Sequence, residues 1–385
     1  MRRPVHVVYG GAHLFKADLC RKLGDVALRS LKVYAPTPQD LAHATGMPSV
    51  IAETVYPLVM EKLQREPIED YRIDFEDGYG YRSDAEEDAH AEQAALEASR
   101  AVKEGWLPAF AGLRIKPFSG PSHARAVRTL QIFLSQFQCP ENFVVTLPKI
   151  SEPAEVRELL KLLQPFGPIK IEIMMETPAA LRHLREIVDA AEGRAVAVHF
   201  GPYDYTSSLG ITATYQSLTH PACDFARNMM LVALADCPVG LSDGPTTLLP
   251  IAPHRGEGLN EAQLLENRTV VHNAWRLHYS NVQRALTNGF YQGWDLHPAQ
   301  LPIRYAAVFA FFHEGLADAS RRLRNFIDSS AQATRVGATF DDAATGEGLL
   351  NFFRRAVDCG AVRPDQLQAL AGVSAGELST LSFKF

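Results

Sequence analysis

The sequence predicts an α/β fold, a (β/α)8 TIM barrel with an insertion after its first strand and a helical C-terminal extension. Eight short runs rich in Val, Ile, Leu and Phe alternate with amphipathic stretches along most of the chain. Uninterrupted apolar runs of this length are typical of strands that are buried on both faces, as in a parallel sheet. A doubly wound open sheet is the alternative, because the number of strands does not distinguish the two folds.

The predicted strands and helices alternate in order along the chain. The strands are Val5–Tyr9, Tyr71–Phe75, Gly112–Lys116, Phe143–Leu147, Ile169–Met175, Ala195–Phe200, Pro238–Leu241 and Tyr291–Leu296. The helices between them are Ser83–Val102, Glu152–Leu163, Pro178–Ala191, Pro221–Asp236 and Asn267–Asn288. The first of these helices opens with a serine cap, and the last ends just before a glycine, which are ordinary start and stop signals.

Two segments depart from this alternation. Between the first two predicted strands the chain holds two or three helical segments, which we interpret as an insertion at about residues 27–70. After the eighth strand the chain stays helical through Ala306–Ile327, and a linker at Ser329–Ala338 precedes a helical tail. We therefore expect a barrel over residues 1–310 and a helical extension over 311–385, which could act as a lid or as an oligomerisation element.

The composition suits a cytoplasmic globular protein with a large core. Of the 385 residues, 46% are hydrophobic and 21% are charged, and the net charge is −6. We expect no nucleic-acid partner because there is no basic block, and no membrane partner because no apolar run is long enough to cross a bilayer. The apolar run near the N-terminus is too short for a secretory signal. The five cysteines form no Cys-x-x-Cys pair for zinc or redox chemistry.

Two acidic residues stand where apolar runs end. Glu176 follows the run at 171–175, and Asp204 follows the run at 195–200 after a Gly-Pro-Tyr turn. A carboxylate at the end of a buried strand lies at the rim of a sheet or barrel, where α/β enzymes hold hard metal ions and bind substrates. The pair predicts one Mg²⁺ site with positions left open for a small oxyacid. In the alternative interpretation, each acid only caps the helix that follows its strand.

Other charged residues occupy equivalent positions on neighbouring strands. Asp74 and Glu76 end the second predicted strand, Arg114 and Lys116 end the third, and Lys149 follows the fourth. Side chains alternate along a strand, so Asp74 shares a face with Glu76, and Arg114 shares one with Lys116. Charges inside a barrel are costly unless they are paired or bound to a metal, so we expect these acids and bases to surround one cavity. A purely structural charge network is the alternative.

The motifs that contain these residues resemble one protein family. They are Ile-Asp-Phe-Glu-Asp at 73–77, Leu-Arg-Ile-Lys-Pro at 113–117, Leu-Pro-Lys-Ile at 147–150, Met-Met-Glu-Thr-Pro at 174–178, Phe-Gly-Pro-Tyr-Asp at 200–204 and Asp-Leu-His-Pro-Ala-Gln at 295–300. In this order, and with Ser-Asp-Gly-Pro at 242–245, they resemble the citrate lyase β-subunit and malyl-CoA lyase family. That family is of the HpcH/HpaI aldolase/citrate lyase type and belongs to the phosphoenolpyruvate/pyruvate-binding barrel superfamily. The resemblance runs from residue 71 to about residue 301.

The resemblance implies a role for each matched residue. It implies that Glu176 and Asp204 coordinate Mg²⁺, with Mn²⁺ as a possible substitute. It implies that Arg114 contacts the substrate carbonyl or the developing enolate. Glu76 and Asp77 are then expected beside the metal, either through water or through a hydrogen bond to the arginine. A metal ion and a fixed guanidinium that face one oxygen would stabilise an enolate.

The resemblance also implies an activity. We expect a Mg²⁺-dependent carbon–carbon lyase or aldolase that acts on a small 2-oxo acid, a 3-hydroxy acid or its acyl-CoA thioester. Gly201 and Pro202, which precede the metal-binding aspartate in its motif, are expected beside the substrate. The alternatives are a thioester hydrolase or a phosphoenolpyruvate-type transferase on the same barrel, and, from another class, a non-catalytic barrel subunit. Barrels of this family assemble through helices near the C-terminus, so a homo-oligomer is expected.

The loop after the first strand departs from the family pattern. Typical members begin with Arg-Ser and carry a Pro-Gly loop here, whereas this chain has Gly10 and Gly11 followed by His13 and Lys16. Two glycines before a helix allow backbone N–H groups to meet an anion, and His13 and Lys16 could then contact a phosphate or carboxylate. The alternative is a tight strand-to-helix turn with a solvated lysine. This departure argues against a CoA-thioester substrate.

Four further residues complete the predictions. Asp341 and Asp342 are the only residues comparable to the acidic lid of malyl-CoA lyase-like members, and they are interpreted as lid acids or, more simply, as helix caps. His199 is interpreted as a core histidine rather than a ligand. His297, in the motif that closes the eighth strand, is expected to be architectural.

Overall fold

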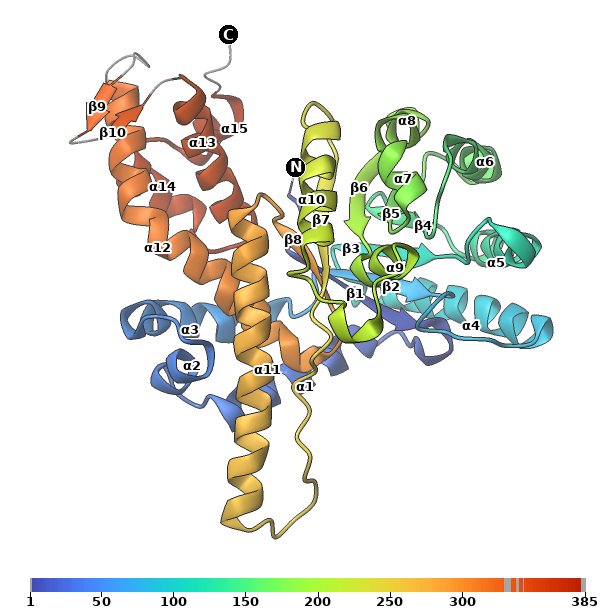
Figure 1. The fold of residues 1–385 in the computed structure, drawn as a ribbon, viewed down its shortest axis with the longest axis horizontal. Coiled ribbons are helices and arrows are strands. Elements are labelled where there is room, and N and C mark those ends of the chain that lie inside the picture. The colour runs from blue at the N-terminus through green and yellow to red at the C-terminus, as the bar shows by residue number, and fades with distance from the viewer. Residues whose placement is uncertain (1, 329–333, 337–338, 342, 382–385) are drawn as a thin grey trace.

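The computed structural model describes residues 2–328, 334–336, 339–341 and 343–381, and it contains the predicted barrel (Figure 1). Eight parallel strands pair in sequence order, and Val8 of the first strand pairs with Tyr71 of the second and with Asp295 of the eighth, which closes the ring. The strands are β1 His6–Gly11, β2 Asp70–Asp74, β3 Phe110–Arg114, β4 Phe143–Leu147, β5 Lys170–Met175, β6 Ala195–Phe200, β7 Gly240–Pro245 and β8 Gln292–Asp295. The closed barrel excludes the doubly wound sheet.

Helices separate all consecutive strands of the barrel. They are α1 Leu19–Tyr34, α2 Pro38–Thr45, α3 Ser49–Arg65, α4 Asp84–Lys103, α5 His123–Gln136, α6 Pro153–Leu163, α7 Pro178–Arg182, α8 Leu184–Asp189, α9 Pro202–Ser208, α10 Pro221–Ala233 and α11 Glu261–Thr287. The single helix predicted over Pro178–Ala191 is wrong, because His183 adopts φ −110° and ψ 19° and divides it into α7 and α8. The sequence prediction also lacks α5 and α9.

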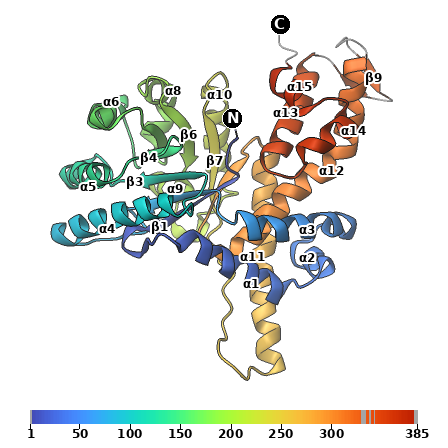
Figure 2. The same ribbon diagram turned by 180° about the vertical axis from the view of Figure 1, so that it is seen from behind.

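The insertion and the C-terminal extension lie on the same side of the barrel (Figures 1 and 2). Within the insertion, α2 and α3 are the additional helices, and they pack against α11 and α12 Leu301–Asp328. The predicted domain boundary at residue 310 falls inside α12, which continues from the barrel into the extension. The extension also contains β9 Thr334–Val336, β10 Thr339–Asp341, α13 Ala343–Asp358, α14 Leu367–Ala371 and α15 Ala375–Thr380.

Apolar side chains of the strands and helices form one continuous core around the barrel. The strand β4 is buried at every residue, which explains why its sequence is an almost continuous apolar run. The strand β2 is also buried at every residue, but its sequence, Asp-Tyr-Arg-Ile-Asp, alternates charged and uncharged side chains. None of the helices in the described residues is both long and apolar enough to cross a membrane.

A buried ion cluster closes the ring where β8 meets β1. Asp295 at the end of β8 accepts hydrogen bonds from Arg304 of α12, with the Nη2 to Oδ1 distance at 2.9 Å, and lies 3.1 Å from Nε2 of His278 on α11. His6 of β1 lies 3.4 Å from the same carboxylate. Burial alone would raise the pKa of Asp295, but Arg304 and His278 outweigh it and hold this pKa well below its usual range.

We expect Asp295→Asn to lower the free energy of unfolding by about 3–5 kcal/mol, because it leaves Arg304 buried without a counter-charge. Urea unfolding would measure this loss. The carboxylate has a lowered pKa in the folded state, so its stabilisation is present above the ordinary aspartate pKa and is lost as the pH falls below it. Asp318→Asn, which breaks an exposed ion pair of α12 with Arg321, is the control and should cost less than about 1 kcal/mol. Equal losses in the two variants would contradict the role of Asp295.

Candidate active site

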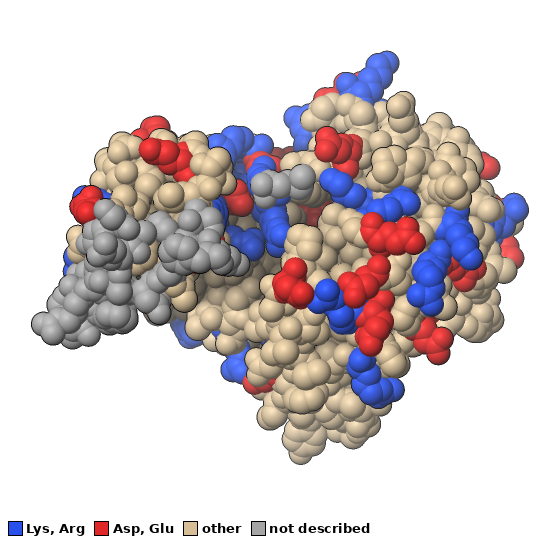
Figure 3. All heavy atoms as spheres, turned by 90° about the horizontal axis from the view of Figure 1, so that it is seen from above, with Lys and Arg blue, Asp and Glu red and all other residues tan. Residues whose placement is uncertain are grey.

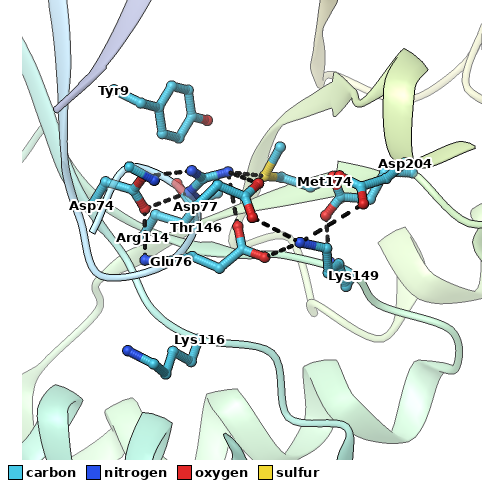
Figure 4. A network of polar contacts seen from close by, with 12 residues as sticks. Tyr9, Asp74, Glu76, Asp77, Arg114, Lys116, Thr146, Lys149, Met174 and Asp204 are labelled. Atoms are coloured by element: carbon cyan, nitrogen blue, oxygen red, sulfur yellow. Dashed lines mark hydrogen bonds and ion pairs between the residues drawn. The ribbon is translucent and has the colours of Figure 1, made fainter. Parts of the chain in front are cut away.

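Arg114, the last residue of β3, is the centre of a cluster of charges at the carboxyl ends of β2 to β6 (Figure 4). Its side chain is only 1% exposed. The guanidinium donates two hydrogen bonds to Asp74, the last residue of β2, with Nε to Oδ1 at 2.6 Å and Nη2 to Oδ2 at 2.5 Å. Glu76 adds a third contact, because its Oε2 lies 2.9 Å from Nη1. The planar guanidinium is therefore fixed in position and direction.

Aromatic rings and a thioether surround the rest of this guanidinium. Its central carbon lies 4.6 Å from the ring centroid of Tyr9 on β1 and 5.4 Å from that of Trp294 on β8. Nη1 lies 3.5 Å from the sulfur of Met174 on β5. Burial would lower the pKa of Arg114, but Asp74 and Glu76 raise it well above its usual value. The site therefore holds a permanent positive charge shielded from water.

Lys149, two residues after β4, connects this arginine cluster with the other acids. Its Nζ binds Glu76 and lies 3.0 Å from Oδ1 of Asp77 and 3.8 Å from Oδ1 of Asp204. Its backbone N–H donates to Oε1 of Glu176 at 2.6 Å. Lys149 has a φ of 48°, a left-handed conformation that is uncommon for a residue other than glycine. Such local strain occurs preferentially at functional sites.

Glu176 and Asp204 form the acidic side of the cluster. Glu176 directly follows β5 and is buried, whereas Asp204 lies in the first turn of α9 with 45% of its side chain exposed. Burial and the negative charges of Glu76 and Asp204 raise the pKa of Glu176 to about 8. Burial also raises the pKa of Asp204. These raised pKa values show that the two carboxylates lack full compensation from the cations of this protein.

This pair of carboxylates fits a hard divalent cation. Carboxylate oxygens are the ligands that Mg²⁺ prefers, and a cation between them would relieve the repulsion that raises the pKa of Glu176. In the described part of the chain, no group of three or more His, Cys, Asp and Glu side chains is arranged to hold a metal ion. Two carboxylate ligands, with water or substrate as the others, are a common arrangement for Mg²⁺.

The structure also places the other predicted substrate residues. Gly201 and Pro202 lie at the start of α9, and Gly201 is packed so closely on Glu176 that a Cβ atom there would lie 2.5 Å from Oε2. His13 packs 5.5 Å from the ring of Tyr79, and Lys16 lies 3.5 Å from Glu97 of α4. These contacts place the last two residues beside α4, so their role in anion binding stays a prediction.

The expectation that Lys116 faces the same cavity as Arg114 is wrong. The strand β3 ends at Arg114, so the alternation of side chains does not extend to position 116. Lys116 donates instead to the carbonyl of Phe75 at 2.9 Å and to Glu87 of α4 at 2.6 Å, and it points away from the cluster (Figure 4). Of the two predicted lid acids, Asp342 lies outside the described residues, as does the side chain of Asp341.

A second charge network fills the barrel interior beneath the arginine. Arg72 of β2 binds Asp70 and also Glu172 of β5, with Nη2 to Oε2 at 2.5 Å. Glu172 in turn contacts Nε2 of His199 at 2.8 Å and accepts a hydrogen bond from the hydroxyl of Tyr9 at 2.9 Å. His199 is therefore a buried core histidine, as predicted. His297 caps the short helix at 298–300, because its Nδ1 accepts from the N–H of Ala299, which confirms its architectural role.

Sequence reasoning missed two residues of the site, Tyr9 and Trp294. It expected Asp74 and Lys149 among the charges around the cavity but gave neither of them an individual role. The signal for Lys149 is its position just after β4, which matches that of Glu176 after β5. Tyr9 and Trp294 carry no comparable signal, because only closure of the barrel brings β1 and β8 next to Arg114.

Comparison with known proteins identifies a family and two similar folds. The whole chain, residues 1–385, matches the family described as "Domain of unknown function (DUF6986)", and it therefore belongs to that family. The search of curated proteins gives no match. A solved citrate lyase from Burkholderia xenovorans LB400 is similar with 19% identity and a TM-score of 0.63, over 96% of this chain and 97% of that one.

A second solved structure is similar to this chain. It is the protein CitE from Mycobacterium tuberculosis in complex with magnesium, acetoacetate and coenzyme A, with 17% identity and a TM-score of 0.54, over 91% of this chain and 97% of that one. At this identity the two likenesses establish the fold. They agree with the closed (β/α)8 barrel that the sequence predicts and the structure contains.

We expect Gly201→Ala to weaken Mg²⁺ binding by about tenfold or more, because the added methyl group must displace the carboxylate of Glu176. Isothermal titration with Mg²⁺ would measure the affinity, and circular dichroism would show that the fold remains. Gly348→Ala is the matched control, since a Cβ there meets nothing within 4 Å on an exposed face of α13. Unchanged affinity in Gly201→Ala would argue against Glu176 as a metal ligand.

The raised pKa of Glu176 predicts a specific pH dependence of stability. Between pH 4.5, its ordinary value, and about 8, the unfolded chain has released this proton while the folded, metal-free chain retains it. Stability should therefore fall with rising pH in this range, and Glu176→Gln should remove that part of the dependence and be the more stable protein at pH 8. Urea unfolding in EDTA across the range would measure both proteins. If the difference in unfolding free energy between the normal chain and Glu176→Gln does not change with pH, the pKa of Glu176 is not raised.

Proposed function

We propose that this member of the DUF6986 family is a Mg²⁺-dependent carbon–carbon lyase or aldolase. Its substrate would be a small 2-oxo acid, a 3-hydroxy acid or its CoA thioester, and the reaction would pass through an enolate. One observation carries the proposal: the buried, permanently charged guanidinium of Arg114 lies in one cluster with the under-compensated carboxylates of Glu176 and Asp204. A fixed cation beside a metal-binding pair suits a reaction that develops negative charge on oxygen.

Each residue of the cluster has a part in this proposal. Glu176 and Asp204 would hold the metal ion, which when bound would polarise a carbonyl oxygen as a Lewis acid. Arg114 would face the same oxygen and stabilise the enolate charge without reorganisation, because Asp74 and the aromatic rings already fix it. Glu76 would orient both Arg114 and Lys149, since it contacts the two cations at once.

Lys149 and Asp77 would complete the mouth of the site. Burial lowers the pKa of Lys149, but Glu76 and Asp77 raise it to a value well above the ordinary lysine value. Lys149 therefore stays protonated at neutral pH and would serve as a second fixed cation rather than as a base. Asp77 has 54% of its side chain exposed, so it lies where substrate and solvent reach the cluster.

The solved relatives support this choice of chemistry. The similar protein from Burkholderia xenovorans LB400 is described as a citrate lyase, and the one from Mycobacterium tuberculosis contains magnesium, acetoacetate and coenzyme A. We infer from the shared barrel and from the residues in place at its mouth that this chain uses the same class of small oxyacid or acyl-CoA ligand. The acyl-CoA form is the less favoured of the two, because the loop at 10–16 departs from the family pattern.

Deuterium exchange into pyruvate tests the enolate step directly. We expect the chain with Mg²⁺ to exchange the methyl protons of pyruvate in D₂O, and EDTA to stop this exchange. Asp204→Asn should slow the exchange by about a hundredfold or more, the scale found when one preorganised stabilising group is lost. Asp189→Asn, an exposed acid of α8 that pairs with Arg185, is the control and should exchange at the normal rate. An exchange rate that changes neither with EDTA nor with Asp204→Asn would overturn the proposal.

Mg²⁺ titration separates an enzyme from a non-catalytic barrel. An enzyme of the proposed type should bind Mg²⁺, and Glu176→Gln should abolish most of that binding. If the normal chain binds Mg²⁺ no better than Glu176→Gln does, the chain is a binding module and the proposed chemistry is excluded.

A further inference from the structure

A polar cavity lies at the opposite end of the barrel from the arginine cluster. It has a volume of about 260 Å³, and its wall includes residues close before three strands, Arg3 three residues before β1, Val239 directly before β7 and Tyr291 directly before β8. Arg355 of α13, in the C-terminal extension, completes it. Figure 3 shows Lys and Arg side chains in the hollow between the extension and the barrel.

Two guanidinium groups meet at this cavity. Arg3 donates to the backbone carbonyls of Val239 and Pro238 at 3.2 and 3.0 Å, which fixes its direction without neutralising its charge. Burial and the positive charge of Arg355 lower the pKa of Arg3, so the two groups repel each other. Arg355 lies with its guanidinium carbon 4.7 Å from the ring centroid of Tyr291, in a cation–π contact.

Asp358 is the acid that faces these arginines. It lies one turn after Arg355 on α13, and a narrower space beside the cavity is lined by Arg3, Arg355 and Asp358. Its influence on Arg3 is smaller than the repulsion from Arg355. One carboxylate against two guanidinium groups leaves a net positive charge at the cavity, which an anion would offset.

The remaining wall of the cavity is largely apolar. It includes Leu231 and Leu234 at the end of α10, together with Val239, Leu241 and the ring of Tyr291. A volume of about 260 Å³ suits a small molecule rather than a nucleotide. The cavity therefore has a positively charged part and an apolar part of similar area.

We propose that this cavity binds a small organic anion, a carboxylate attached to an apolar or aromatic body. Arg3 and Arg355 would bind the carboxylate through charge-assisted hydrogen bonds. The leucine and valine side chains would cover the apolar body, and Tyr291 would lie against it. The ligand would connect the barrel with the C-terminal extension, since Arg3 belongs to the first and Arg355 to the second.

Titration calorimetry with benzoate tests this site. Benzoate carries a carboxylate on a flat apolar ring, benzamide is its neutral counterpart, and EDTA in the buffer keeps divalent metals from the catalytic end. We expect benzoate to bind at one site per chain, and Arg3→Met and Arg355→Met each to weaken binding about tenfold or more, as loss of a hydrogen bond to a charged group does. Asp358→Asn should tighten binding severalfold, because it removes the opposing negative charge.

Controls separate the loss of a ligand contact from the loss of the fold. Arg363→Met, an exposed arginine of the extension paired with Asp365, should leave benzoate binding unchanged. Arg355→Lys keeps the positive charge but loses the planar guanidinium, so its benzoate affinity should lie between those of the normal chain and Arg355→Met. Thermal melts by circular dichroism would show that each variant is folded. Benzamide or inorganic phosphate binding as tightly as benzoate, or benzoate binding that ignores the Arg3 and Arg355 changes, would overturn the proposal.

Discussion

The two-point ion pair between Arg114 and Asp74 is the constraint on which the candidate site depends. A guanidinium in the interior of a barrel loses its hydration, and it is tolerated only because a carboxylate on the next strand takes two of its N–H groups. The pair also fixes the plane of the guanidinium against Tyr9 and directs one nitrogen towards Glu76. The remaining charges at the mouth are arranged around this fixed cation.

The charges of the barrel interior form two layers, each with more carboxylates than arginine and lysine side chains. In the lower layer, Arg72 contacts both Asp70 and Glu172, and Glu172 also contacts His199. In the upper layer, at the mouth, Arg114 and Lys149 face five carboxylates, those of Asp74, Glu76, Asp77, Glu176 and Asp204. The lower layer pairs its charges inside the barrel, whereas the acids of the upper layer include the partly exposed side chains of Asp77 and Asp204. The proposed divalent cation would offset this excess of negative charge.

The same principle applies to the two ends of the molecule. The mouth of the barrel has too many acids for its bases, and the cavity beneath the C-terminal extension has too many bases for its acid. The strands β1 and β8 run from the cavity at one end of the barrel to the mouth at the other. They carry Tyr9 and Trp294, which lie beside Arg114. Uncompensated charge of either sign is costly in a folded chain unless a ligand shares it.

The sequence by itself determined the strands, their order and the acids that follow them. Periodicity and residue type are local properties, so the apolar runs identified all eight strands, and the motifs identified Arg114, Glu176 and Asp204 in advance. The largest difference in a strand is at β7, where the sequence predicts Pro238–Leu241 and the chain extends to Pro245. Ser242 pairs with both β6 and β8, and Pro245 pairs with β8, whereas Asp243 and Gly244 between them lie at a register shift that residue type does not predict.

Only the tertiary structure decided which charged side chains contact one another. Lys116 and Lys149 are equivalent in sequence, since each lies two residues past its strand, yet Lys149 contacts three acids at the mouth and Lys116 turns outward to Glu87. Likewise, only the packing of α13 against the barrel brings Arg355 to the cavity that Arg3 lines. The direction of a side chain beyond the end of a strand depends on the conformation of its loop and on the charged residues that barrel closure brings near it. Those charged residues are far away in the sequence, so local sequence patterns do not determine the direction.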